Sequence, residues 1–187
     1  MRKLSIITSV FGIFFYSAWS LASNTELRPI THEDVWLMQR LGTPVVSPDG
    51  SKAVVSVSQP SYEKDGTHSD LWLLAVDGSS EPLQLTTTRQ AEGGVAWSPD
   101  GSKIAFTSKR ADDEASQVYL LNMQGPGEAV AITDISTGAR NPVWSPDGNH
   151  IAFESRVYPG MANDAANAEE KKSRDKSDIN VSVYESF

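Results

Sequence analysis

The sequence has 187 residues and a formal net charge of −8, from 24 Asp and Glu against 16 Lys and Arg. An acidic chain gains nothing from nucleic-acid phosphates or anionic lipid headgroups, so nucleic acid is excluded as an expected partner. Cysteine is absent, which excludes disulfide bonds and a lipid-modified cysteine, so the core must depend on burial alone.

The amino terminus has the organisation of a secretory signal peptide. Two cations, Arg2 and Lys3, precede an apolar stretch that runs to about Leu21, and small residues around Ala22 suit a signal peptidase. We therefore expect cleavage near Ala22, removal of residues 1–22, and a periplasmic or secreted mature chain. The alternative is an uncleaved anchor, which polar interruptions disfavour because a membrane span needs about 20 apolar residues.

Residues 23–43 are expected to form a leader segment that contains a short helix. Thr31 can cap this helix, acidic residues follow in its first turn, and Gly42 and Pro44 end it. Its apolar residues share one face, which predicts packing against the rest of the domain: Val35, Met38 and Leu41.

An internal repeat is the most informative feature of the chain. A Ser-Pro-Asp-Gly turn between two apolar runs begins at Ser47, Ser98 and Ser145, at intervals of 51 and 47 residues. Blades of β-propellers recur every ~40–50 residues. The tetrad has the residues that a type I turn prefers, with glycine free to adopt the left-handed conformation that follows it. Each repeat therefore predicts an antiparallel hairpin.

The second repeat predicts strands that are buried on both faces. Trp97, Ile104 and Phe106 share one bulky apolar face, whereas Ala96 and Ala105 lie on the opposite, small one. Stacked propeller blades bury both faces of each sheet.

A second hairpin follows each of the first two turns, over Leu71–Val76 with Leu83–Thr86 and over Val118–Leu121 with Val130–Thr133. Two hairpins per period predict four strands per blade. We therefore predict an all-β fold, an incomplete β-propeller of about three four-stranded blades over residues 44–187. A β-sandwich is the alternative, but it has no need of the same turn tetrad at a fixed interval.

Residues 159–178 interrupt the repeat with a polar segment of mixed charge in which Met161 is the one large apolar side chain. Such a composition predicts a long, mobile insertion. Ile179, Val181 and Val183 then alternate as a further strand.

The order of these segments resembles the opening of the prolyl oligopeptidase family, in its branch of acylaminoacyl peptidases and bacterial dipeptidyl peptidases. The similarity rests on the helix that begins at Thr31–Asp34, the repeated turns, and the charged insertion before a strand at Val181–Tyr184, and it spans residues 30–187. No single motif is specific, because Ser-Pro-Asp-Gly repeats also occur in TolB-like periplasmic propellers.

The resemblance implies a propeller of seven or eight blades that caps an α/β-hydrolase domain and restricts entry to short peptides. A Ser-Asp-His triad would lie in that hydrolase domain. The Gly-x-Ser-x-Gly motif of its nucleophile does not occur in this sequence. We therefore expect no catalytic residue in this chain, and a catalytic domain that is missing from it.

Other candidates for chemistry are weak. Gly66–Asp70 contains Ser, His and Asp, but triad members come together from separate segments, so a polar loop is expected there. The pair Glu169 and Glu170 is better interpreted as a solvated charge run than as a site for a peptide's amino terminus. The sequon at Asn180–Ser182 is interpreted as accidental.

Neither a cofactor nor a metal site is expected. Histidine residues lie far apart in the sequence, without the spacing of zinc ligands, at His32, His68 and His150. The repeated carboxylates are explained by their turn position, at Asp49, Asp100 and Asp147.

Two functions remain. In the first, the chain is the substrate-gating propeller segment of an exported serine exopeptidase that acts on short peptides. In the second, it is a TolB-like periplasmic propeller that binds proteins without catalysis. In either case an incomplete ring exposes open blade edges, which predicts self-association.

Overall fold

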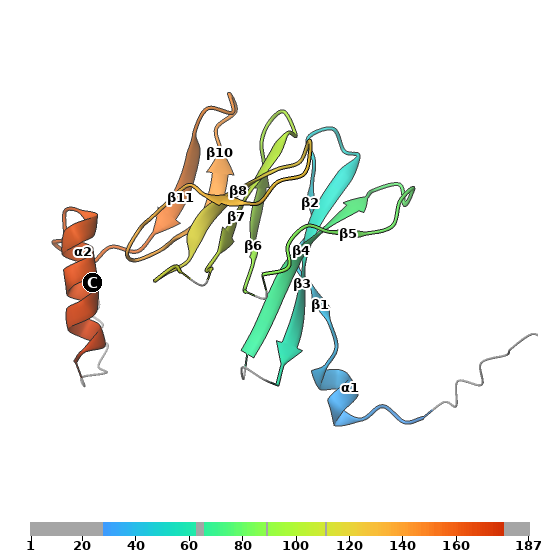
Figure 1. Cartoon of the computed structure of the whole chain (residues 1–187), viewed down its shortest axis with the longest axis horizontal. Helices are drawn as coiled ribbons and strands as arrows, with labels where there is room; N and C mark the ends of the chain where they lie inside the picture. The colour runs from blue at the N-terminus through green and yellow to red at the C-terminus, as the bar shows by residue number, and fades with distance from the viewer. Residues whose placement is uncertain (1–27, 63–65, 89, 111, 178–187) are drawn as a thin grey trace, which may run out of the picture. The chain divides into compact units, whose positions relative to one another are not determined.

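The computed structural model describes residues 28–62, 66–88, 90–110 and 112–177 (Figure 1). The chain divides into two compact units, residues 1–31 and 32–187, and the elements described below belong to the second. The predicted signal peptide at residues 1–22 and the predicted strand at 179–183 lie outside the described residues.

The described strands form three antiparallel sheets, one for each Ser-Pro-Asp-Gly turn (Figure 1). The first has the order β1-β3-β4-β5, with β2 also paired to β3: β1 (Arg40–Leu41), β2 (Val45–Val46), β3 (Lys52–Ser61), β4 (Gly66–Ala75) and β5 (Leu83–Gln84). The second has the order β6-β7-β8-β9: β6 (Gly93–Trp97), β7 (Lys103–Ser108), β8 (Gln117–Asn122) and β9 (Val130–Ala131). The third is a hairpin: β10 (Ala139–Trp144) and β11 (Ile151–Ser155).

These sheets confirm the predicted propeller architecture. Both second hairpins are present, because β4 pairs with β5 and β8 pairs with β9. Of the three predicted four-stranded blades, the second sheet has four strands, and the first has five because β1 and β2 both pair with β3. Of the third blade, the described residues contain only the hairpin of β10 and β11.

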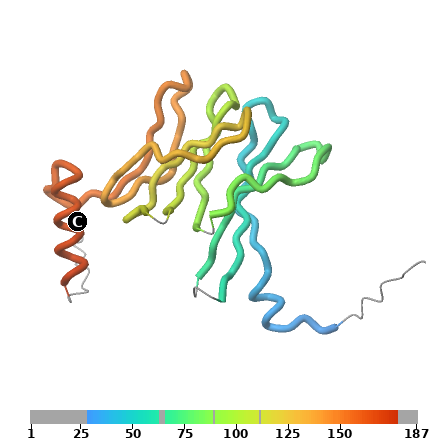
Figure 2. Tube along the Cα trace, viewed as in Figure 1, coloured from blue at the N-terminus to red at the C-terminus, as the bar shows by residue number. Residues whose placement is uncertain are grey.

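Each Ser-Pro-Asp-Gly turn is held by hydrogen bonds within its own residues. In the second turn the Ser98 hydroxyl donates to Asp100 Oδ1 at 2.6 Å and accepts from the Lys103 amide at 2.9 Å. The Ser102 amide donates to the same carboxylate at 3.0 Å. Gly101 has a φ of 69°, which glycine adopts without strain. The first and third turns repeat this pattern, and all three lie at the same end of the sheets (Figure 2).

The blades are joined by an indole hydrogen bond at each interface. Trp97 Nε1 donates to the carbonyl of Val45 in the first blade at 2.9 Å. One repeat later, Trp144 Nε1 donates to the carbonyl of Ala96 in the second blade at 3.2 Å. The same type of contact therefore recurs from blade to blade.

The hydrophobic core lies between the blades. On the bulky face of the second sheet, Ile104 and Phe106 are fully buried against Val54 and Leu71 of the first sheet. On the small face, Ala105 and Val118 are fully buried and pack against Ala139 of the third sheet. The predicted burial of both faces is confirmed, and shape complementarity explains why one face is bulky and the other small.

The leader helix is shorter than predicted and its apolar face is not packed. Helix α1 spans only His32–Trp36 and contains no buried residue. Val35 and Met38 are 51% and 58% exposed. Leu41 lies in β1 and pairs with Val57 of β3, because the strand ladder satisfies its backbone in place of a helix. The prediction of a helix that extends to Gly42 and packs through this face was therefore wrong.

The polar segment at residues 159–178 contains a helix, α2 (Asp164–Asp175). Asn163 caps it by accepting a hydrogen bond from the Ala166 amide at 2.9 Å. The buried side chain of Asn167 accepts from the Tyr158 amide at 2.8 Å. The expectation that nothing anchors this segment was wrong, because polar side chains anchor it where apolar ones are missing. Its mobility stays a prediction.

Candidate functional site

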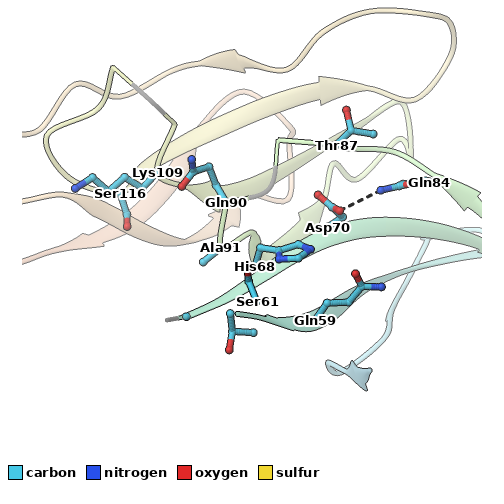
Figure 3. Close-up of a pocket in the computed structure, with 12 residues that line it drawn as sticks. Gln59, Ser61, His68, Asp70, Gln84, Thr87, Gln90, Ala91, Lys109 and Ser116 are labelled. Carbon is cyan, nitrogen blue, oxygen red and sulfur yellow. Dashed lines mark hydrogen bonds between the residues drawn. The ribbon is translucent and has the colours of Figure 1, made fainter. Parts of the chain in front are cut away.

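A polar cavity of about 780 Å3 lies beside the long hairpin of β3 and β4 (Figure 3). Gln59 and Ser61 line it from β3, His68 and Asp70 from β4, and Gln90 from the segment before the second blade. These groups offer both donors and acceptors of hydrogen bonds. The cavity is therefore suited to binding a polar molecule.

Asp70 supplies the negative charge of this cavity. Its Oδ2 accepts a hydrogen bond from Gln84 Nε2 at 3.0 Å, which fixes the carboxylate (Figure 3). Its Oδ1 is buried and has no hydrogen-bond partner among the described residues. A carboxylate oxygen in this condition can accept a further hydrogen bond from an N–H donor or a cation.

The residues of the Gly66–Asp70 segment do not form a triad. The segment was predicted to be a polar loop but belongs to β4, where the ladder to β3 pairs Gln59 with His68. Successive residues of a strand point to opposite faces, so Ser69 points away from His68 and Asp70. The Ser69 hydroxyl is buried and donates to the Glu92 carbonyl at 2.8 Å. It is a structural link to the second blade.

Glu92 is a buried carboxylate that the sequence analysis missed. It lies before β6, and its Oε1 accepts hydrogen bonds from Thr88 at 2.8 Å and from Ser108 at 3.4 Å. Arg110 Nη2 lies 4.0 Å from the same oxygen. Burial raises the pKa of Glu92, against the lowering effects of hydrogen bonds from Thr86 and Thr88 and of the Arg110 charge. The sequence around it, with no periodic pattern or motif, carried no signal of this role.

Arg110 connects Glu92 to an aromatic contact in the second blade. Its guanidinium carbon lies 4.5 Å from the centre of the Tyr119 ring, within cation–π range. The Tyr119 hydroxyl donates to Asp113 Oδ2 at 2.7 Å. Burial, together with the Asp113 carboxylate, raises the pKa of Tyr119 to about 12. Tyr119 is therefore neutral at physiological pH and acts as a donor.

Each of the three turn aspartates accepts hydrogen bonds within its own turn, as its turn position predicts. Each carboxylate accepts hydrogen bonds from the turn serine hydroxyl and from the backbone amide two residues after the aspartate. These bonds, the hydroxyl first, lower the pKa of Asp49 and of Asp100 to about 2. The same bonds lower the pKa of Asp147. Asp49 and Asp100 line one small pocket between neighbouring turns, and Asp100 and Asp147 line another, but each carboxylate is hydrogen-bonded inside its own turn.

The remaining candidates are dispersed over the fold. His32 lies in α1, His68 in β4, and His150 directly after the third turn. In the part of the chain that the structure describes, no three His, Asp or Glu residues are grouped as a metal site would need. On α2, Glu170 pairs with Arg174 at 2.7 Å. None of the described helices is long and apolar enough to cross a membrane.

Comparison with protein families gives a match over residues 35–178 to a model described as a TolB β-propeller domain. Among curated proteins, the chain is 34% identical over 87 residues to the uncharacterized peptidase YuxL of Bacillus subtilis. The aligned region is 46% of this chain and 13% of YuxL. The chain is 31% identical over 105 residues to dipeptidyl-peptidase 5 of Porphyromonas gingivalis, which covers 51% and 15%. The chain thus matches only a small part of the length of these relatives.

Two solved structures are similar in fold. The AtxE2 isopeptidase without ligand matches with a TM-score of 0.55 and 18% identity, over 78% of this chain and 26% of that one. The acylaminoacyl peptidase of Pyrococcus horikoshii matches with a TM-score of 0.50 and 14% identity, over 69% and 20%. At these identities the likeness concerns the fold alone.

Proposed function

Because the chain belongs to the TolB β-propeller domain family, we propose that it serves as the propeller segment of an exported serine exopeptidase acting on short peptides. Its role in that protein is to control access of substrate. The chemistry belongs to an α/β-hydrolase domain whose sequence is not part of this chain. There a serine hydroxyl would attack the peptide carbonyl and form an acyl-enzyme, while the peptide C–N bond breaks and the rest of the peptide leaves as an amine that takes up the serine proton through a histidine base; water then releases the acyl group.

One observation carries the proposal: both curated relatives are named as peptidases, and this chain aligns with only 13% and 15% of their lengths. A propeller segment is expected to align with only a minor part of each relative, because the rest of the peptidase lies outside the aligned region. The cavity beside β3 and β4 also supports it, because polar groups such as Gln59, Asp70 and Gln90 can exchange hydrogen bonds with a solvated peptide.

A TolB-like binding module without catalysis is the second candidate, favoured by the family description itself. This function needs no hydrolase domain. The two candidates differ in what the gene encodes after the codon for Phe187.

The first test is therefore to sequence the DNA that follows this codon. A Gly-x-Ser-x-Gly motif, in any reading frame and within roughly 400 codons, is expected for the peptidase. The protein encoded by the joined frame should then cleave dipeptidyl or aminoacyl chromogenic substrates, and a serine-directed phosphonate should abolish this cleavage. The matched control replaces the serine of that motif by alanine. Absence of the motif, or activity that survives this replacement, would contradict the proposal.

Export to the periplasm or the medium is part of the proposal, and it is supported by the sequence of residues 1–22. Its test is the amino-terminal sequence of the protein recovered from the periplasm of a bacterial host. We expect Ser23 as the first residue. Replacement of Ala22 by Arg should leave the precursor uncleaved, because signal peptidases require a small residue before the cut.

A further inference from the structure

The cavity beside β3 and β4 is lined by two consecutive blades. The first blade contributes strand residues such as Asp70. The second contributes Lys109, directly after β7, and Ser116, directly before β8. Among the described lining residues only Gly66 and Ala91 lack a polar group in the side chain. Such a lining disfavours an apolar ligand and can exchange hydrogen bonds with a charged one.

The walls of the cavity are held in place by hydrogen bonds of the fold itself. The Ser69 amide donates to the Gln90 carbonyl at 2.9 Å. The Ser69 hydroxyl donates to the Glu92 carbonyl and accepts from the Glu92 amide, both at 2.8 Å. In the second blade, the Ser116 carbonyl accepts from the Ala139 amide at 2.7 Å. A site that is fixed in this way loses little conformational entropy when a ligand binds.

The cavity carries opposite charges on its two walls. Asp70 is held by Gln84, and its buried Oδ1 has no hydrogen-bond partner among the described residues. Lys109 supplies a positive charge from the second blade, and in Figure 3 Gln90 lies between the two charged side chains. An ammonium suits the first wall and a carboxylate the second. Because Gln90 separates the walls, a dipeptide spans them better than a single amino acid.

We propose that this cavity binds a free dipeptide, whose α-ammonium donates to Asp70 Oδ1 and whose carboxylate accepts from the Lys109 ammonium. A volume of about 780 Å3 lies within the range of small-molecule sites, about 300–1,000 Å3. The choice of a peptide over other zwitterions rests on the proposed function. The test needs no hydrolase domain, so that dipeptide binding and peptidase activity can fail separately.

The first test changes the ligand and uses the unaltered chain. Isothermal titration calorimetry compares alanyl-alanine with its N-acetyl derivative, which lacks the ammonium, and with its C-terminal amide, which lacks the carboxylate. Acetylation should weaken binding roughly ten- to hundredfold, because the ammonium contacts a buried carboxylate oxygen. Amidation should weaken it roughly three- to tenfold, because Lys109 is exposed to water.

Three results of this titration would overturn the proposal. The first is no binding of alanyl-alanine at concentrations up to about 10 mM. The second is equal affinity for the acetylated dipeptide. The third is equal affinity for the amide, which would mean that the cavity accepts a cation and does not recognise a carboxylate. None of these results depends on whether a variant of the chain folds.

The second test changes the chain. Asp70→Asn removes the charge but keeps an oxygen for Gln84, and Lys109→Gln removes the opposite charge. The matched control is Glu81→Gln, at an exposed carboxylate between β4 and β5 that does not line the cavity. Circular dichroism checks that the variants fold.

Asp70→Asn should weaken binding of alanyl-alanine as much as acetylation does, and it should leave the affinity for the acetylated dipeptide unchanged. Lys109→Gln should likewise leave the affinity for the amide unchanged, and Glu81→Gln should alter none of the affinities. If a folded Asp70→Asn chain binds alanyl-alanine as tightly as the unaltered chain, the dipeptide binds elsewhere and the proposal is wrong.

Discussion

The indole of Trp97 and the carbonyl of Val45 are 52 positions apart in the sequence, and a hydrogen bond of 2.9 Å joins them across the first blade interface. Trp97 is only 9% exposed, so the donor is almost fully removed from water. A buried N–H that loses its acceptor is left with a desolvation penalty, which makes this bond a sensitive measure of blade packing.

Trp97→Phe should destabilise the fold by about 1–3 kcal/mol, since the hydrogen bond and part of the buried indole volume are lost together. Urea denaturation followed by circular dichroism measures this change. The control is Trp144→Phe, where the bond is longer at 3.2 Å and the residue is less buried, so a smaller loss is expected. Equal losses at the two positions would show that burial does not determine the strength of the contact.

Ser98→Ala should lower the free energy of unfolding by about 1–2 kcal/mol, because Ser98 is 3% exposed and the Lys103 amide would lose its acceptor. The matched replacement Ser145→Ala removes the same bonds from a more exposed turn, where water can replace them. Thermal melts of both variants provide the comparison. A larger effect for Ser145→Ala would contradict the view that burial controls the contribution of these turns.

Glu92→Gln should change how stability depends on pH. Because the pKa of Glu92 is raised in the folded chain, the folded state retains this proton at pH values where the unfolded chain has lost it. The stabilising contribution is therefore complete below the ordinary pKa of about 4.5 and is lost as pH rises through the folded pKa. Urea titrations between pH 4 and 8 should show the unaltered chain losing stability relative to Glu92→Gln with rising pH.

The control for the pH experiment is Glu154→Gln, at a carboxylate that is exposed on β11 and 3.6 Å from Arg140. The difference in free energy of unfolding between Glu154→Gln and the unaltered chain should not change with pH as the difference for Glu92→Gln does. If the difference between Glu92→Gln and the unaltered chain is constant over this pH range, Glu92 does not titrate differently on folding.

Trypsin should first cut the segment at residues 159–178, at Lys172 or nearby basic residues, before any site in the sheets such as Lys103. Asn163→Ala should accelerate this cleavage several-fold, because loss of the cap weakens α2 by about 1 kcal/mol. Glu169→Ala, at an exposed position of the same helix, should leave the rate near that of the unaltered chain. Mass spectrometry of timed digests identifies the cuts. First cleavage at Lys103 or Lys109 would mean that the blades themselves are open.

The purified chain from residue 23 to 187 should hydrolyse neither dipeptidyl nor aminoacyl chromogenic substrates, because it has no Gly-x-Ser-x-Gly sequence and Ser69 is turned away from His68. Release of the chromophore is followed by absorbance. Turnover above background that a serine-directed phosphonate blocks would refute this expectation.

The blades could be predicted from the sequence because local rules and burial agree there. A turn tetrad such as the one at Ser98–Gly101 specifies its own geometry, and the alternation of Trp97 with Ala96 specifies which face is bulky. Since the same pattern recurs, each repeat supports the interpretation of the others. The propeller is therefore predictable from local patterns without any long-range contact.

The other elements depend on contacts that composition does not reveal. Helix α2 is anchored by polar groups, as where Asn167 accepts a hydrogen bond from the Tyr158 amide, and the hydrophobic pattern of the sequence gives no sign of such an anchor. Leu41 would lie on the apolar face of the predicted helix, but its backbone pairs with Val57 of β3 instead. Glu92 lies outside any motif, and it is buried because Ser108 of β7 and Arg110, which follows that strand, pack around it.

The bonds that shape each Ser-Pro-Asp-Gly turn span at most five positions along the chain, as between Ser98 and Lys103. Contacts of such short range form early in folding, because little loop entropy opposes them, and hairpins close within about 1–10 μs. The indole bonds, by contrast, join positions 48 and 52 residues apart. The expected order of events is therefore a set of independent hairpins that are complete before any two blades meet. The slow step is then the docking of preformed blades, in which the indoles of Trp97 and Trp144 form their hydrogen bonds with the carbonyls of the preceding blade.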